Sequence, residues 1–164
     1  MKARVLIVLA VLAVAAASQA TSERAAAARG VRVSVFLPKG DPGARCNRVL
    51  PVSRTVVFPA VLRGAMLQLL RGPTAAERGR GYGGWFSSRT AGMLRGVRLA
   101  GGVAYVDFRD FRRVIPNASS SCGSALLLAQ LDRTATQFPT VRRAIYSFDG
   151  SRRAFYEWLQ RSAP

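Results

Sequence analysis

The sequence contains no histidine, and this absence removes several kinds of active site. Serine and cysteine nucleophiles are usually activated by a histidine base, so the ordinary Ser-His-Asp and Cys-His systems are excluded. Histidine is also the commonest zinc ligand, and two cysteines cannot make an all-cysteine zinc site. We therefore expect a protein that is not an enzyme and that holds no metal and no other cofactor.

Acidic residues and lysines are scarce. The chain has 8 aspartates and glutamates against 25 lysines and arginines, so its net charge is +17, and Lys2 and Lys39 are its only lysines. The arginines are spread along the chain, which fits either a solvated surface in an arginine-biased proteome or attraction to anionic partners. Lipid head groups and wall polymers are such partners. No nucleic-acid partner is expected, because no RNA- or DNA-binding motif accompanies the charge.

Long hydrophobic runs are also absent, with one exception at the N-terminus. An apolar run, Val5 to Ala17, follows Lys2 and Arg4 and precedes Ser18-Gln19-Ala20, whose small residues suit a signal peptidase. This pattern predicts a signal peptide over 1–20, a flexible lead-in over 21–30, and an exported protein that is secreted or associated with the envelope. The run is short for a membrane span of ~20 residues, but uncleaved it would still serve as an anchor. No cysteine follows directly, which argues against a lipoprotein.

Only two cysteines are present, Cys46 and Cys122. In an exported chain two cysteines most often form a disulfide, and we predict that bond here. The alternative is a pair of buried free thiols.

Apolar spacing predicts the elements of an α+β domain. Alternation indicates strands at 31–37 and 49–58, a hairpin with a Gly101-Gly102 turn, and a strand at 141–148. Helical spacing indicates one helix that opens at Pro59 and stops at Gly72-Pro73, and a second that follows the serines 119–121. The order is β-β-α-β-β-α-β with a helical tail at 152–160. We expect one mixed sheet with two main helices packed on it.

The segment from Thr74 to Ala91 is long for a loop in a compact domain, and such loops are often functional. Its glycines follow a helix end, where the helix dipole repels phosphate, so a phosphate-binding loop is not expected. Thr74 and Glu77 have the spacing of a capping box. The candidate binding residues of this loop are Arg78, Arg80, Tyr82 and Trp85. With Phe86, the aromatic residues would either stack on a sugar or fold back onto the core.

Few side chains remain as catalytic candidates. Asp107 and Asp110 stand three apart, and two carboxylates are the requirement for glycoside hydrolysis. An aspartate at a strand end more often accepts backbone hydrogen bonds in a turn, so we expect that role. Ser119, Ser120 and Ser121 have no partner base and are expected to cap a helix.

Several ordered motifs together resemble the GerMN domain family. They are "LLRGPTAAE" at 69–77, "LRGVRLAGGVAYVDF" at 94–108 and "SSSCGSALLLAQLDRTATQFPTVRRAIYSFDG" at 119–150. The tail "AFYEWLQ" looks like the single-domain exported members, in which a cysteine pair also falls where Cys46 and Cys122 stand. The resemblance places a GerMN-like domain at 31–160.

The resemblance implies a ring-building-motif-like α/β module found in spore-germination, sporulation and envelope proteins. Such modules act in protein interaction, and the family offers no catalytic residues to carry over. This chain departs from the family pattern in two ways: it lacks a lipobox, and it is far more basic than expected for the family. The expected function is that of an interaction or structural module of the bacterial envelope, with envelope proteins or further copies of itself as partners. The alternative is a binder of anionic wall polymers or of a membrane surface through its arginines.

Overall fold

The computed structural model describes residues 29–40 and 46–164. The predicted signal peptide and nearly all of the predicted lead-in lie outside these residues, so both stay predictions. In the two described ranges no helix has the length and apolar character needed to cross a membrane.

The elements confirm the predicted α+β class and the predicted order of strands and main helices. They are β1 (Gly30–Leu37), β2 (Leu50–Val57), α2 (Val61–Leu70), α3 (Ala75–Gly79), β3 (Leu94–Ala100), β4 (Val103–Phe108), the 3-10 helix η1 (Pro116–Ser119), α4 (Ser121–Ala135), β5 (Arg143–Phe148) and α5 (Arg152–Trp158). The short helix α3 starts at the predicted capping box. The tail forms the predicted last helix, α5.

The expectation of a single sheet is wrong, because the strands form two sheets. β1 and β2 make an antiparallel two-stranded ribbon, and β3, β4 and β5 make a second sheet in that order. In the second sheet β3 and β4 pair antiparallel, whereas β4 and β5 pair parallel. The outer edge of β1 bonds to side chains of α4 and of the segment just after it, and not to another strand. The Ser34 amide donates to Gln137 Oε1 at 2.8 Å, and the Phe36 amide donates to Thr134 Oγ1 at 3.2 Å.

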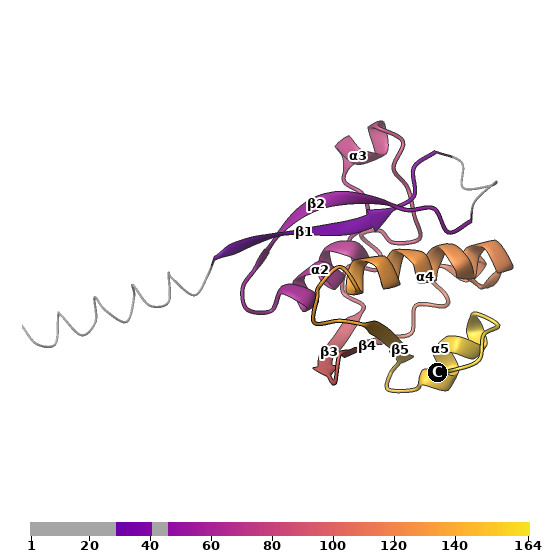
Figure 1. Cartoon of the computed structure of the whole chain (residues 1–164). Coiled ribbons are helices and arrows are strands. Elements are labelled where there is room, and N and C mark those ends of the chain that lie inside the picture. Colours follow the sequence, from indigo (N-terminus) through magenta and orange to yellow (C-terminus); the bar gives the residue numbers. More distant parts are fainter. Residues whose placement is uncertain (1–28, 41–45) are drawn as a thin grey trace, which may run out of the picture.

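Helices α2 and α4 lie between the two sheets, and each contacts both of them (Figure 1). The core is therefore built from all three layers. Its fully buried members include Val35, Leu37, Met66, Leu69, Leu127, Leu131, Phe108 and Phe155. Burying apolar area at ~25 cal/mol per Å² makes this packing the main favourable term in folding.

Helix α2 begins two residues later than predicted. Its N-cap is Ala60, and its first turn closes where the Gly64 amide donates to the Ala60 carbonyl at 2.8 Å. Pro59 therefore precedes the helix. The predicted stop is confirmed, since Gly72 has φ of +69°, a conformation that favours glycine.

The two cysteines are bonded to each other, as predicted. Cys46 lies in the connection before β2, and Cys122 lies in the first turn of α4. Their Cα atoms are 5.0 Å apart. The disulfide thus joins the β1–β2 ribbon to the helix layer.

Candidate functional site

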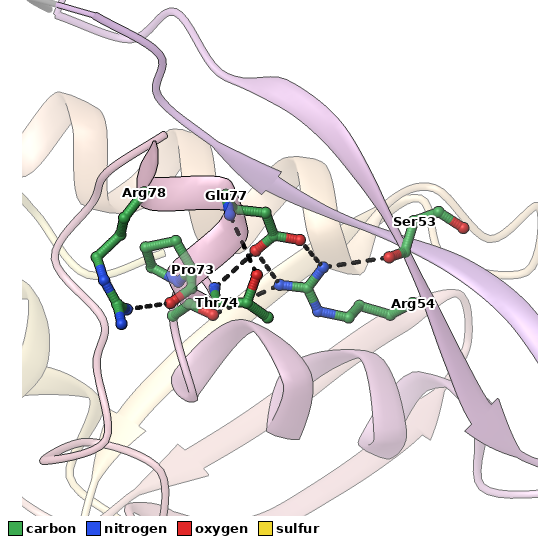
Figure 2. A network of polar contacts seen from close by, with 7 residues as sticks. Ser53, Arg54, Pro73, Thr74, Glu77 and Arg78 are labelled. Carbon is green, nitrogen blue, oxygen red and sulfur yellow. Dashed lines mark hydrogen bonds and ion pairs between the residues drawn. The ribbon is translucent and has the colours of Figure 1, made fainter. Parts of the chain in front are cut away.

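A buried ion pair holds the segment after α2 against the ribbon. Arg54 of β2 donates to Glu77 of α3 through both terminal nitrogens, at 2.5 and 2.7 Å (Figure 2). Only 11% of the arginine side chain and 6% of the glutamate side chain are exposed. Arg54 also donates to the backbone carbonyls of Ser53 and Gly72. The planar fork of arginine suits this two-pronged contact, so the pair fixes the orientation of α3.

Thr74 and Glu77 form the predicted capping box. The Glu77 amide donates to Thr74 Oγ1 at 3.3 Å, and the Thr74 amide donates to Glu77 Oε2 at 2.8 Å. The hydrogen bond from Arg54 holds the pKa of Glu77 below its ordinary value, although burial of the carboxyl acts in the opposite direction. The sequence motif located the glutamate, but nothing in the sequence pointed to Arg54 as its partner.

The four predicted binding residues do not gather at one place. Arg80 and Tyr82 line a hollow between α3 and β2, together with Lys39, and the Lys39 ammonium lies 5.3 Å from the centre of the Tyr82 ring. Arg78 instead donates to the Pro73 carbonyl, so its head group is turned back onto its own segment (Figure 2). Trp85 lies elsewhere, against α4.

The aromatic residues of the loop pack inward more than they face solvent. Trp85 Nε1 donates to the Gly123 carbonyl at 3.2 Å, and the Trp85 amide donates to Gln130 Oε1. Phe86 is 2% exposed and belongs to the core. Of the two alternatives for this loop, the structure favours packing, and a sugar-stacking platform of Tyr82, Trp85 and Phe86 is not formed. Gln130, which the sequence analysis did not single out, anchors the loop to α4.

Asp107 is occupied by structural hydrogen bonds. Its carboxylate accepts from Ser147 Oγ at 2.6 Å and from the Gly150 amide at 2.8 Å, and it pairs with Arg95 at 2.9 Å. These contacts tie β4 to the end of β5. The arrangement fits the expected structural role and offers no free general acid or base.

Asp110 and the serines also have structural partners. Asp110 accepts from the amide and guanidinium of Arg112, whose hydrogen bond lowers the pKa of this carboxyl. Ser120 is the N-cap of α4, as expected, and accepts from the Gly123 amide at 3.1 Å. Neither set forms a nucleophile with a base.

A carboxyl and a tyrosine lie together between α4 and β5. The Tyr146 hydroxyl donates to Asp132 Oδ1 at 2.7 Å. Burial raises the pKa of Asp132, and it raises the pKa of the fully buried Tyr146 as well. The pair connects the helix layer to the three-stranded sheet. In the described part of the chain no cluster of three or more Cys, Asp or Glu residues could hold a metal ion.

Comparisons with known proteins give one match. No curated protein and no solved structure matches the chain. A family model, described as "Germane: Sporulation and spore germination", matches residues 34–153, which run from β1 into α5. This match confirms the family that the motifs suggested. The protein therefore belongs to the Germane family of sporulation and spore-germination domains.

Proposed function

We propose that this protein is a non-catalytic interaction module that acts outside the cytoplasm, at the bacterial envelope. The observation that carries the proposal is that the carboxylates considered for catalysis are already bonded to other parts of the fold. Asp107, Asp110 and Glu77 are all engaged in contacts that hold elements together. Catalysis would need an acid, base or nucleophile that is free to react and correctly placed, whereas binding a partner needs only an accessible surface.

A second function is favoured by the exposed arginines. Apart from Arg54, every arginine that the structure describes is exposed. Of these exposed arginines, Arg95, Arg112 and Arg153 form ion pairs with described carboxylates. The others leave the surface strongly positive, which suits binding to anionic wall polymers or to a membrane surface. Such binding weakens steeply with salt, because contacts between exposed charges are screened.

One experiment separates the two functions. The oxidised protein without residues 1–20 is passed over a size-exclusion column with light scattering, alone and mixed with envelope fractions. A protein partner, or a second copy, predicts complexes that persist in roughly 0.5 M salt and that disappear when the envelope fraction is pre-treated with protease. Binding to a wall polymer predicts complexes that disappear in roughly 0.5 M salt and that survive protease treatment of the envelope fraction. A protein that stays monomeric and binds nothing in the envelope fraction, with or without protease treatment, would contradict both functions.

The proposed export has its own test. Signal-peptide cleavage after Ala20 predicts a mature chain that begins at Thr21. N-terminal sequencing of the protein from the extracytoplasmic fraction checks this. A chain that keeps Met1 and stays in the cytoplasm would contradict the proposed location.

A further inference from the structure

The ribbon has one edge that the rest of the molecule covers and one that it does not. On the covered side, Gln137 bonds both main-chain groups of Ser34, accepting from its amide at 2.8 Å and donating to its carbonyl at 2.7 Å. Thr134 accepts from the Phe36 amide. Thr134 of α4 and Gln137 just after the helix therefore take the place of a third strand beside β1. The outer edge of β2 has less cover: Arg54 donates to the Ser53 carbonyl at 3.1 Å, and no described residue accepts a hydrogen bond from the outward amides of this edge.

The register identifies the groups on that outer edge. In an antiparallel pair, alternate residues direct their main-chain groups toward the partner strand and away from it. Ser34 lies opposite Ser53, and the Ser34 amide points away from β2, so the Ser53 amide points away from β1. The same alternation turns the amides of Thr55 and Val57 outward. Among the residues that the structure describes, none accepts a hydrogen bond from these three amides.

From Ser53 to Val57, this edge lacks the features that usually block strand addition. Proteins protect open edges with charged side chains, prolines, bulges or coverage by other elements, and Pro51 is such a residue near the start of β2. The other hairpin has such protection, because β3 carries Arg95 and Arg98 and has a register shift next to Gly96. The β1–β2 register is uninterrupted from Gly30↔Val57 to Leu37↔Leu50. The exposed side chains along the β2 edge are uncharged, and they are Pro51, Ser53, Thr55 and Val57.

Two hollows follow one another along the same edge. The first is lined by Pro51 and Ser53 of β2 and by Lys39, Arg80 and Tyr82. The second is lined by Thr55 and Val57 of β2 and by Arg63, Leu67 and Arg71 of α2 and its end. The second leads to a patch of exposed apolar surface, since Val57 is 59% and Phe58 54% exposed. An added strand would thus find side-chain hollows beside the main-chain groups it pairs with.

The charges around these hollows indicate what kind of strand would bind there. Each hollow has two cations, Lys39 with Arg80 in the first and Arg63 with Arg71 in the second. Glu77 is the one carboxylate among the described lining residues. It lies in the first hollow, and Arg54 neutralises it at 2.5 Å. A second copy of this chain, itself at +17, would bring the same cations together and be repelled. An extended segment with alternating apolar and acidic side chains is complementary.

We propose that the outer edge of β2 binds an acidic, extended segment of a partner protein, which pairs as a third strand of the ribbon. This inference rests on the proposed function, in that it names the surface through which the interaction module meets a protein. The outward amides of Ser53, Thr55 and Val57 supply the pairing, together with the carbonyls of Thr55 and Val57, because the Ser53 carbonyl already accepts from Arg54. The four cations select the acidic segment and set its register.

The test uses a peptide of five Val-Glu repeats as the probe, with the oxidised protein lacking residues 1–20. Amide exchange by NMR should show protection gained at Ser53, Thr55 and Val57, whereas Val52 and Arg54, which already face β1, should change little. The matched control peptide has the same sequence with all its backbone amides N-methylated, which keeps the charge but removes the N–H groups of both edges and so prevents strand pairing. We expect it to bind at least about tenfold more weakly.

Two sets of variants complete the test. Ser53→Pro with Thr55→Pro removes two outward amides, and Pro is tolerated where a strand faces no partner. Ser53→Ala with Thr55→Val keeps them. Only the proline variant should lose the peptide, by about tenfold or more. Circular dichroism shows that each variant folds.

Arg63→Glu with Arg71→Glu tests the charges without altering the backbone. Its control is Arg89→Glu with Arg113→Glu, which makes the same charge change away from both hollows. We expect loss of peptide binding only in the first pair. Equal binding of the N-methylated peptide, or equal losses in both arginine pairs, would overturn the proposal in favour of a general polyanion surface. If the envelope experiment finds no protein partner while this peptide still pairs, the proposed function fails and the edge assignment stands.

Discussion

At the residue scale, the polar side chains that looked like candidates for chemistry act as connectors between elements. Glu77 joins α3 to β2, and Asp107 joins β4 to the turn after β5. The two differ in burial, since Glu77 is nearly enclosed whereas 27% of the Asp107 side chain is exposed. Breaking a buried pair leaves an uncompensated charge, so Glu77 is the more sensitive position.

Replacing Glu77 by glutamine should lower the free energy of unfolding at neutral pH by about 3 kcal/mol, because Arg54 stays buried without its counter-charge. The pH dependence should change as well. The folded-state pKa of Glu77 lies below the ordinary value of 4.5, so its contribution is complete above pH 4.5 and is lost as the pH falls toward the folded pKa. Urea unfolding of both proteins across this acid range measures the difference.

The control for this variant is Glu157→Gln, which breaks an exposed pair with Arg153. Exposed pairs contribute little, so its stability should be nearly unchanged. If Glu77→Gln were as mild as Glu157→Gln, or if its difference from the native protein did not shrink in acid, the ion pair would not have the role assigned to it.

At the scale of elements, the helix stop at Gly72 sets the course of the loop that follows. Gly72 has φ of +69°, and a Cβ built on it would overlap the carbonyl of Phe86. The glycine therefore serves both the end of α2 and the close approach of the loop to it. Thr90 adds a second link, since its hydroxyl donates to the Leu70 carbonyl at 2.6 Å. The Gly-Pro-Thr signature is thus architectural.

Gly72→Ala should destabilise the protein by about 2 kcal/mol or more, since alanine is strained at this φ and its Cβ meets the Phe86 carbonyl. Gly79→Ala is the matched control. Gly79 lies in α3, and a Cβ there would have no neighbour within 4 Å. Alanine should be neutral at that position or stabilise by up to about 1 kcal/mol. Thermal unfolding compares the two. An unchanged Gly72→Ala protein that had lost partner binding would assign Gly72 to a binding site.

At the scale of the whole molecule, the fold is held by packing across three layers and by one covalent link. The disulfide lies between the ribbon and α4, with its cysteines 76 residues apart in sequence. The layers contact each other through α2 and α4, which touch strands of both sheets. Loss of the covalent link should therefore weaken the fold as a unit and not one hairpin alone.

Reduction of Cys46–Cys122 should lower the free energy of unfolding by about 4 kcal/mol, because the link restricts a long loop of the unfolded chain. Urea unfolding with and without a reductant measures this loss. The variant Cys46→Ser with Cys122→Ser should show the same loss and no further effect of the reductant. A native protein that ignored the reductant would mean that the bond contributes nothing to stability.

The sequence alone determined the features that depend on neighbours along the chain. Alternating valines predicted β1, Gly101-Gly102 predicted the turn between β3 and β4, and Thr74 with Glu77 predicted the cap of α3. Each rests on backbone preferences or on contacts within a few residues. Ordered motifs also identified the family, and the presence of just two cysteines predicted their bond.

Only the tertiary structure decided how these elements meet. It divided the strands into two sheets, because Thr134 of α4 and Gln137 just after it close the edge of β1. It joined Arg54 to Glu77 and turned Trp85 onto α4, so the predicted binding loop became partly core. It also left the edge of β2 open beside four cations. These contacts join residues that are far apart in the sequence. A pattern of neighbouring residues therefore does not show which of them will meet in the fold.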